Sequence, residues 1–219
     1  MLGQGIYLLN EAARYTGVPS STLRSWFMQR PDEKGQGPIF KSDWDKEGDD
    51  YALSFLNLIE VHVAAHFKSK GIIPRHIRKV HKILSNEWGI EHPFASQDLR
   101  TDNDVKQVIW SRSSDSALID VLKRQMVLET ARPYLERIKY NLASKMAELW
   151  HIADGIVINP KVGFGKPVIE NTGVSTLIVA NQFLANGRDA ALVARMFKIA
   201  PASVLSAFEF ERSLKRIAA

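Results

Sequence analysis

The most constraining feature of this chain is a pair of expected helices near its start, separated by a short break. Residues 9–16 and 20–30 are predicted to be helical, and Gly17-Val18-Pro19 interrupts them. Glycine allows the left-handed backbone of a sharp turn, and proline fits the first turn of a helix, where its missing N–H is not needed. The pattern predicts a helix-turn-helix.

Five side chains have the types and offsets that a helix-turn-helix requires. They are the small Ala13, the turn residues Gly17 and Val18, and the apolar Leu23 and Trp26. The second helix of this motif enters the major groove with its early residues against base edges. The candidates for DNA contact on this helix are Ser20, Ser21, Thr22, Arg24 and Ser25. Arg30 is expected to meet phosphate, and an ordinary helical hairpin is the alternative.

The following loop, residues 31–50, is rich in turn formers and acids. Ile39-Phe40-Lys41 and Trp44 are expected to form a short hairpin, the wing of a winged helix, with Lys41 as a further DNA contact. Five of the residues from Asp43 onward are acidic, so the whole loop cannot face phosphate. Their spacing does not match an EF-hand loop, and no metal site is predicted.

Basic charge is concentrated just beyond this loop. The formal net charge of the chain is +5, and residues 51–90 carry six Lys/Arg against two acids. All six lie between Lys68 and Lys82, a run without acids. Such a patch attracts nucleic acid, although a solvated helix face is the simpler alternative.

Two helices are predicted to carry this patch. The first covers residues 53–70 and ends at Gly71, and the second begins at Pro74. The expected buried stripe of the second helix is Ile77, Val80 and Leu84. The residues expected to flank the phosphate backbone are Arg75, Arg78, Lys79 and Lys82. His62 and His66 lack the glutamate of a zinc-protease motif and are expected to be a buried pair.

The order of these pieces resembles the MerR-like winged helix family. The matching stretches are NEAARYTGVPSSTLRSW, an expected hairpin, and SFLNLIEVHVAAHFKSKGIIPRHIRKV, over roughly residues 6–86. The resemblance implies a DNA-binding domain over residues 1–90. Residues 91–154 are expected to be an α+β connector and dimerisation region, with strands at Val105–Ser111 and Ile138–Tyr140 and a helical stretch at 113–141 interrupted by Pro133.

Residues 155–219 are expected to form a C-terminal trihelical domain. Short strands are predicted at Ile156–Ile158 and Pro167–Ile169, and helices at 175–186, at 190–197 and from Pro201 to about Lys215. Asp189 suits the N-cap of the second of these helices. The residues with helix-turn-helix offsets are Ala194, Ile199, Val204 and Leu205, without a turn glycine. A plain three-helix bundle is equally compatible.

The sequence of this region resembles the domain-of-unknown-function family 433. The matching segments are NP…GFGKPVIENTGVS and ALVARMFKIAPASVLSAFEF, with departures at Asn171-Thr172-Gly173 and in the turn after Phe197. Together with the MerR-like start, it resembles a VapB-type antitoxin subfamily. This resemblance implies a PIN-like ribonuclease toxin, encoded alongside, as the partner.

DNA contact is assigned to the N-terminal module because Glu209 and Glu211 on the last helix would repel phosphate. The C-terminal domain is assigned to protein contact. Its aromatic residues exceed what one small bundle needs, and Phe164 is the expected partner anchor. The cations expected to pair with the toxin's acidic site are Arg212, Lys215 and Arg216.

The sequence therefore predicts a mainly α protein with small β elements that acts as an antitoxin and as a repressor of its own operon. It is expected to be a homodimer bound to double-stranded operator DNA in the cytoplasm. No cofactor or catalytic activity is expected: cysteine is absent, and Gly163–Lys166 lacks the Ser/Thr of a phosphate loop. No run of 18 apolar residues indicates a membrane helix, and the start lacks the pattern of a secretory signal. The alternatives are a MerR-like, ligand-responsive transcriptional regulator and a protein-interaction module without DNA affinity.

Overall fold

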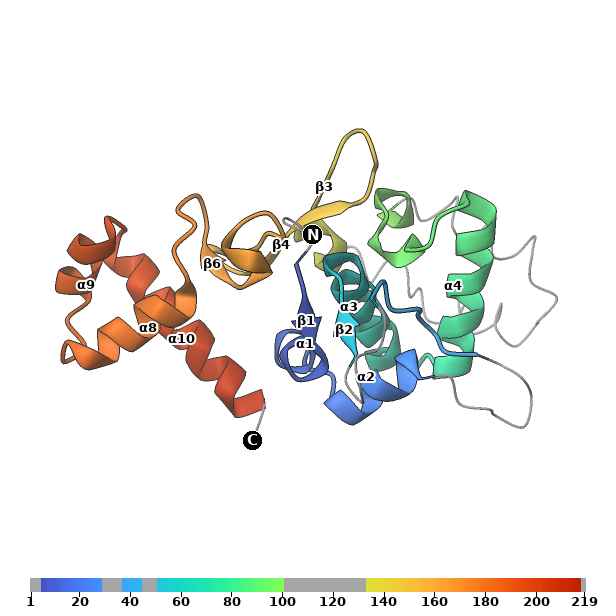
Figure 1. Ribbon diagram of the computed structural model, residues 1–219, viewed down its shortest axis with the longest axis horizontal. Coiled ribbons are helices and arrows are strands. Elements are labelled where there is room, and N and C mark those ends of the chain that lie inside the picture. Colours follow the sequence, from blue (N-terminus) through green and yellow to red (C-terminus); the bar gives the residue numbers. More distant parts are fainter. Residues whose placement is uncertain (1–4, 29–36, 45–50, 101–132, 218–219) are drawn as a thin grey trace. The chain divides into compact units, whose positions relative to one another are not determined.

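The fold is taken from a computed structural model that describes residues 5–28, 37–44, 51–100 and 133–217 (Figure 1). It is mainly helical, with short β-strands. Its contacts divide the chain into two units. The N-terminal unit spans residues 7–147, and the C-terminal unit holds residues 148–219 together with the first residues of the chain.

The N-terminal unit opens with two short helices at the predicted place. Helix α1 (Leu9–Thr16) ends at Gly17, whose φ of 71° is left-handed, and helix α2 (Ser20–Phe27) follows. Pro19 lies one position earlier than expected, at the N-cap. The fully buried small residue of α1 is Ala12, whereas the expected Ala13 is half-buried.

The expected hairpin at Ile39–Trp44 is wrong for the part of it that the structure describes. Residues 37–44 contain no strand, and the backbone N–H groups of Ile39 and Phe40 both donate to the carbonyl of Trp26. The side chain of Phe40 is buried and contacts the rings of Phe27 and Phe94. Burial of these apolar side chains draws the loop into the core instead of leaving it as a projecting ribbon.

A small antiparallel sheet forms elsewhere, between β1 (Tyr7–Leu8) and β2 (Ala52–Leu53). Leu53 was expected inside the next helix, but α3 starts later, at Phe55, and ends at Ser69. The cause is Ser54, whose hydroxyl accepts from the backbone N–H of Asn57 and caps the helix. Helix α4 (Pro74–Trp88) begins at the predicted proline.

The predicted apolar stripe of α4 is confirmed, because Ile77, Val80 and Leu84 are all buried. Two short 3-10 helices follow, η1 (Pro93–Ala95) and η2 (Gln97–Arg100). The predicted strand Ile138–Tyr140 is present as β3. The predicted strand at Val105–Ser111 and most of the helix at 113–141 lie outside the described residues, and a helical turn is present at 133–136.

The C-terminal unit pairs strands β4 (Ala147–Ala153), β5 (Ile156–Ile158) and β6 (Val168–Ile169) in antiparallel order. The segment after β5 contains a 3-10 turn, η3 (Gly163–Gly165). Strand β5 has the predicted bounds, and β6 begins one residue after the predicted Pro167, but β4 was not predicted from the sequence.

Three helices complete this unit: α8 (Thr176–Ala185), α9 (Ala190–Phe197) and α10 (Pro201–Ile217) (Figure 1). Asp189 caps α9 as predicted, since its Oδ1 accepts from the N–H of Leu192. Their shared core contains Val179, Phe183, Val193, Val204 and Ala207. Leu205, one of the expected helix-turn-helix positions, is 48% exposed and lies outside this core.

No single helix in the described ranges is both long and apolar enough to cross a membrane. Helices α9 and α10 meet the length and composition criterion only when counted together, across a bend of 103°.

Candidate functional site

The start of α2 is the first candidate surface. Ser20 and Ser21 are exposed, whereas Thr22, Arg24 and Ser25 are half-buried. The hydroxyl of Ser25 donates to the carbonyl of Thr22 at 2.7 Å, so it is already engaged within the helix. The strongest candidates for contact on this helix are therefore its exposed first residues. Arg30 lies outside the described residues.

The basic candidates of this unit lie on two further segments. Lys41 is exposed in the loop at 37–44. On α4, Arg75 is exposed, and Arg78 and Lys79 are half-buried. The buried side chains of Phe40 and Ile77 anchor these two segments in the core.

Asn57 holds the loop at 37–44 against α3. Its side chain is fully buried, donates from Nδ2 to the carbonyl of Lys41 at 3.1 Å and accepts from the N–H of Asp43 at 3.2 Å. The amide thus fixes the backbone on both sides of Ser42, whose own hydroxyl donates to the carbonyl of Ala52. Lys41 is consequently presented by an ordered turn.

A buried charge network lies behind this turn, and the sequence analysis missed it. Glu60 is 1% exposed and accepts at one oxygen from His81 Nε2 at 2.8 Å and at the other from His92 Nδ1 at 3.1 Å. The second ring nitrogen of His92 lies 3.0 Å from Asp43. The network therefore joins α3, α4, the segment before η1 and the loop at 37–44.

The network keeps His92 protonated. Burial by itself lowers the pKa of His92, but its hydrogen bonds to Asp43 and Glu60 and their charges outweigh burial and raise the pKa to about 10. The pKa of Glu60 is likewise held below its ordinary value by His81 and His92, against the opposing effect of burial. A positively charged His92 between the two carboxylates compensates the buried negative charge of Glu60.

Asp43, Glu91 and His92 could also hold a metal ion. Their ligand atoms all lie within 4.8 Å of one another. Both ring nitrogens of His92 already lie within hydrogen-bond distance of carboxylates, so a cation would have to displace the proton on Nε2. A raised pKa makes that displacement unfavourable at neutral pH. The arrangement therefore favours a structural ion network over a metal centre.

His62 and His66 form the buried pair that the sequence predicted. His66 is 5% exposed, His62 is half-buried, and both rings lie against Tyr134. Burial, aided by the charges of His66 and Arg137, lowers the pKa of His62 to about 4. His62 is neutral at pH 7 and belongs to the packing of this helix.

Phe164, the expected partner anchor, is strongly exposed. Its side chain is 82% exposed, while Trp150, Phe183 and Phe210 are buried. Its backbone has φ 56° and ψ 27°, the left-handed region that non-glycine residues seldom occupy. A bulky side chain in a strained conformation with little packing in return points to a function outside the fold.

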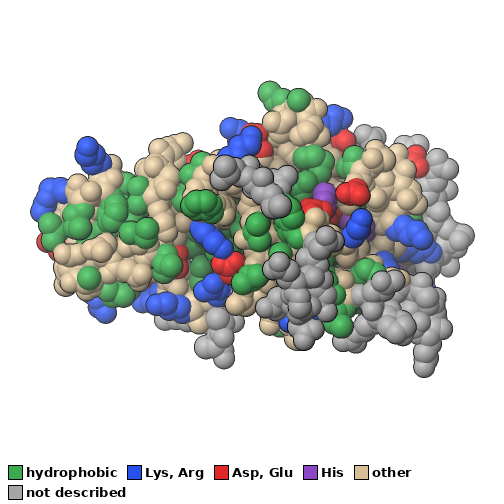
Figure 2. All heavy atoms as spheres, in the orientation of Figure 1, with side chains coloured by type: hydrophobic (Ala, Val, Ile, Leu, Met, Phe, Trp, Pro, Cys, Tyr) green, Lys and Arg blue, Asp and Glu red, His purple; other side chains and the backbone are tan. Residues whose placement is uncertain are grey.

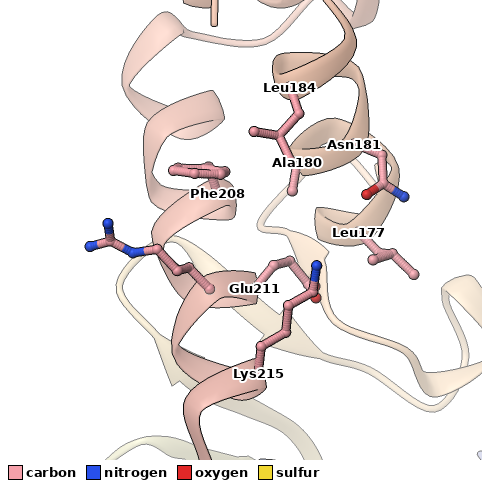
Figure 3. Close-up of a pocket in the computed structure, with 8 residues that line it drawn as sticks. Leu177, Ala180, Asn181, Leu184, Phe208, Glu211 and Lys215 are labelled. Carbon is pink, nitrogen blue, oxygen red and sulfur yellow. The ribbon is translucent and has the colours of Figure 1, made fainter.

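The second candidate surface is a groove between α8 and α10, which we name the α8–α10 groove (Figure 3). Its lining residues are Leu177, Ala180, Asn181, Leu184, Phe208, Glu211, Arg212 and Lys215. Glu211 accepts a hydrogen bond from the hydroxyl of Thr176, and Arg212 pairs with Glu209. Two of the three cations that the sequence assigned to a partner therefore line this groove. The side chain of the third, Arg216, lies outside the described residues.

Comparison with known proteins agrees with this architecture. The model of the family "Protein of unknown function (DUF433)" matches residues 156–210. A Mycobacterium tuberculosis protein named "Putative antitoxin VapB45" is 32% identical over 196 residues, covering 77% of this chain and 78% of that protein. The crystal structure of Rv2018 from Mycobacterium tuberculosis has a TM-score of 0.73 and 27% identity, covering 92% of this chain and 95% of that one. The chain therefore belongs to the VapB-type antitoxin family, with a DUF433 domain in its C-terminal unit.

Proposed function

We propose that this antitoxin neutralises a PIN-like ribonuclease toxin by direct binding and represses its own operon by binding double-stranded operator DNA. The N-terminal unit binds DNA as a MerR-like helix-turn-helix, and the homodimer contacts two half-sites of the operator. The C-terminal unit binds the toxin. Family membership supports the toxin partner, and the surface of the N-terminal unit supports DNA binding.

The observation that carries the DNA-binding half is the start of α2. Its N-cap is Pro19, which has no side-chain acceptor, so the first backbone N–H groups of the helix have no side-chain cap. Exposed Ser20 and Ser21 stand beside them. A helix N-terminus without a side-chain cap and with adjacent hydroxyls suits a phosphate, and the cations of α4 add affinity that does not depend on sequence.

Fluorescence anisotropy with a labelled duplex from upstream of the gene tests this half. About five phosphate contacts would give a slope of log K against log salt near −4 to −5. Arg75→Ala should weaken binding and make the slope shallower by about one. Lys145→Ala is the matched control, because Lys145 is an exposed cation of the same unit that pairs with Asp98. A flat salt slope for the unaltered protein would refute DNA binding.

The toxin-binding half rests on Phe164 and on the cations at the end of α10. Phe164 offers an exposed aromatic side chain of the kind that dominates interface energies. Arg212 and Lys215 are exposed and can pair with the acidic site of a ribonuclease, where Arg216 is proposed to join them.

Growth assays test this half directly. The product of the adjoining gene should arrest growth when expressed alone and lose that effect when this chain is expressed with it. Replacing Arg212, Lys215 and Arg216 together by alanine should abolish the rescue. Full rescue by the triple variant would exclude these cations from the mechanism, and absence of arrest would remove the toxin partner.

A further inference from the structure

The α8–α10 groove is built from two helix faces with the same spacing. On α8, Leu177, Asn181 and Leu184 follow one another at four and three residues, and on α10, Phe208, Arg212 and Lys215 repeat that interval. Each wall thus spans two helical turns, about 10 Å. A groove with two such walls offers contacts to about two turns of a third helix.

The two ends of the groove differ in chemistry. Figure 3 places Phe208 beside Leu184 and Ala180 at one end, and Lys215 beside Glu211 at the other. Leu177 is 50% exposed and Leu184 is 46% exposed, so a docked helix could cover both side chains. The groove therefore has an apolar end and, along the same axis, a charged end that carries Lys215, Arg212 and Glu211.

Both acids near the charged end have partners within this unit. Glu211 accepts from Thr176, the first residue of α8, where the positive end of the helix dipole also stabilises its charge. Arg212 pairs with Glu209 but remains half-exposed on its side chain. Lys215 is exposed. An incoming carboxylate therefore finds Lys215 and the exposed face of Arg212.

We propose that the α8–α10 groove binds an amphipathic helix of the toxin, with apolar residues three or four positions apart and a carboxylate about one turn beyond them. This proposal rests on the toxin partnership proposed above and names the surface that serves it. A second copy of this chain is the poorer occupant, because residues 151–219 carry eight Lys/Arg against five acids and would meet a like-charged surface. Figure 2 shows hydrophobic side chains gathered on the C-terminal unit with Lys and Arg at the margins.

Calorimetric titration of the full chain with the purified product of the adjoining gene tests the groove. Leu184→Ser and Lys215→Glu should each weaken binding about tenfold or more, as expected at a central contact. Met196→Ser is the matched control, because Met196 is 52% exposed on α9 of the same unit and does not line the groove. The control should bind within about twofold of the unaltered chain. Circular dichroism confirms folding, since all three positions are exposed.

The outcomes separate the two proposals. If the unaltered chain binds and both groove variants bind equally well, the groove proposal is overturned and the toxin partnership stands. If the unaltered chain does not bind, both proposals fall. If Leu184→Ser instead changes the mass measured by light scattering while toxin affinity holds, the occupant is a second copy and the proposal is wrong.

Discussion

Replacing His92 by leucine should destabilise the N-terminal unit by about 3–5 kcal/mol at neutral pH. The substitution removes the charge between Asp43 and Glu60 and leaves the buried Glu60 with His81 alone. Loss of one partner from a buried ion network typically costs that much. The pKa of His92, raised from an ordinary 6.5 to about 10 by its two carboxylate partners, has the same sign, since the charged form is favoured by folding.

The pH dependence of the unfolding free energy shows whether the charge on His92 is responsible for the loss of stability. A pKa that is raised on folding contributes stability that is full below the unfolded value of 6.5 and is lost as pH rises through about 10. The lowered pKa values of Asp43 and Glu60 contribute stability that is lost as pH falls through their folded values. The difference between wild type and His92→Leu should thus be widest near about pH 5–6.5 and shrink by at most about 1.4 kcal/mol per unit above it.

Urea unfolding at several pH values measures this difference, with circular dichroism and tryptophan fluorescence followed together to separate the two units. Lys82→Gln is the control, because Lys82 is an exposed charge on α4 of the same unit and lies outside the network formed by Asp43, Glu60, His81 and His92. The control should change stability little. A difference for His92→Leu that stays constant from about pH 6 to pH 10 would refute a charged His92.

Three further changes test other parts of the structure. Leu23→Ala, at a fully buried site, should cost about 2–5 kcal/mol in urea unfolding; a smaller loss would mean that α2 is not packed as described. Gly17→Ala should cost about 1 kcal/mol by backbone strain alone, since nothing lies within 4 Å of the added Cβ; no loss would exclude the left-handed turn. Phe164→Asn should keep or raise the melting temperature, because asparagine tolerates this backbone, while weakening toxin binding in calorimetry; unchanged affinity would exclude Phe164 as an anchor.

Local sequence signals predicted most of the helices. Gly17 and Gly71 mark the ends of α1 and α3, Pro74 opens α4, and Asp189 caps α9. Each of these residues affects only the backbone a few positions away, so its effect can be predicted without knowledge of the tertiary structure. The apolar stripe of α4 was equally predictable, because helical spacing alone assigns its buried face.

The errors arose where distant residues compete for the same backbone. The residue types of Ile39 and Phe40 favour a strand. Their backbone N–H groups instead donate to the carbonyl of Trp26, and the ring of Phe40 packs against that of Trp26. Glycine stands at the turn of the first helix pair, whereas Lys198 adopts the left-handed conformation in the turn before α10. Tertiary packing, rather than residue preference, decides such positions.

By itself the sequence determined the helix order, the basic region and the family resemblance, because each depends on neighbouring residues. Only the tertiary structure revealed the network around Glu60, whose partner His92 lies 32 residues away on another element. The same holds for the α8–α10 groove, whose walls are about 30 residues apart in the chain and meet only when the core of the C-terminal unit forms. Charge and shape at these sites come from side chains brought together by burial, which no local pattern records.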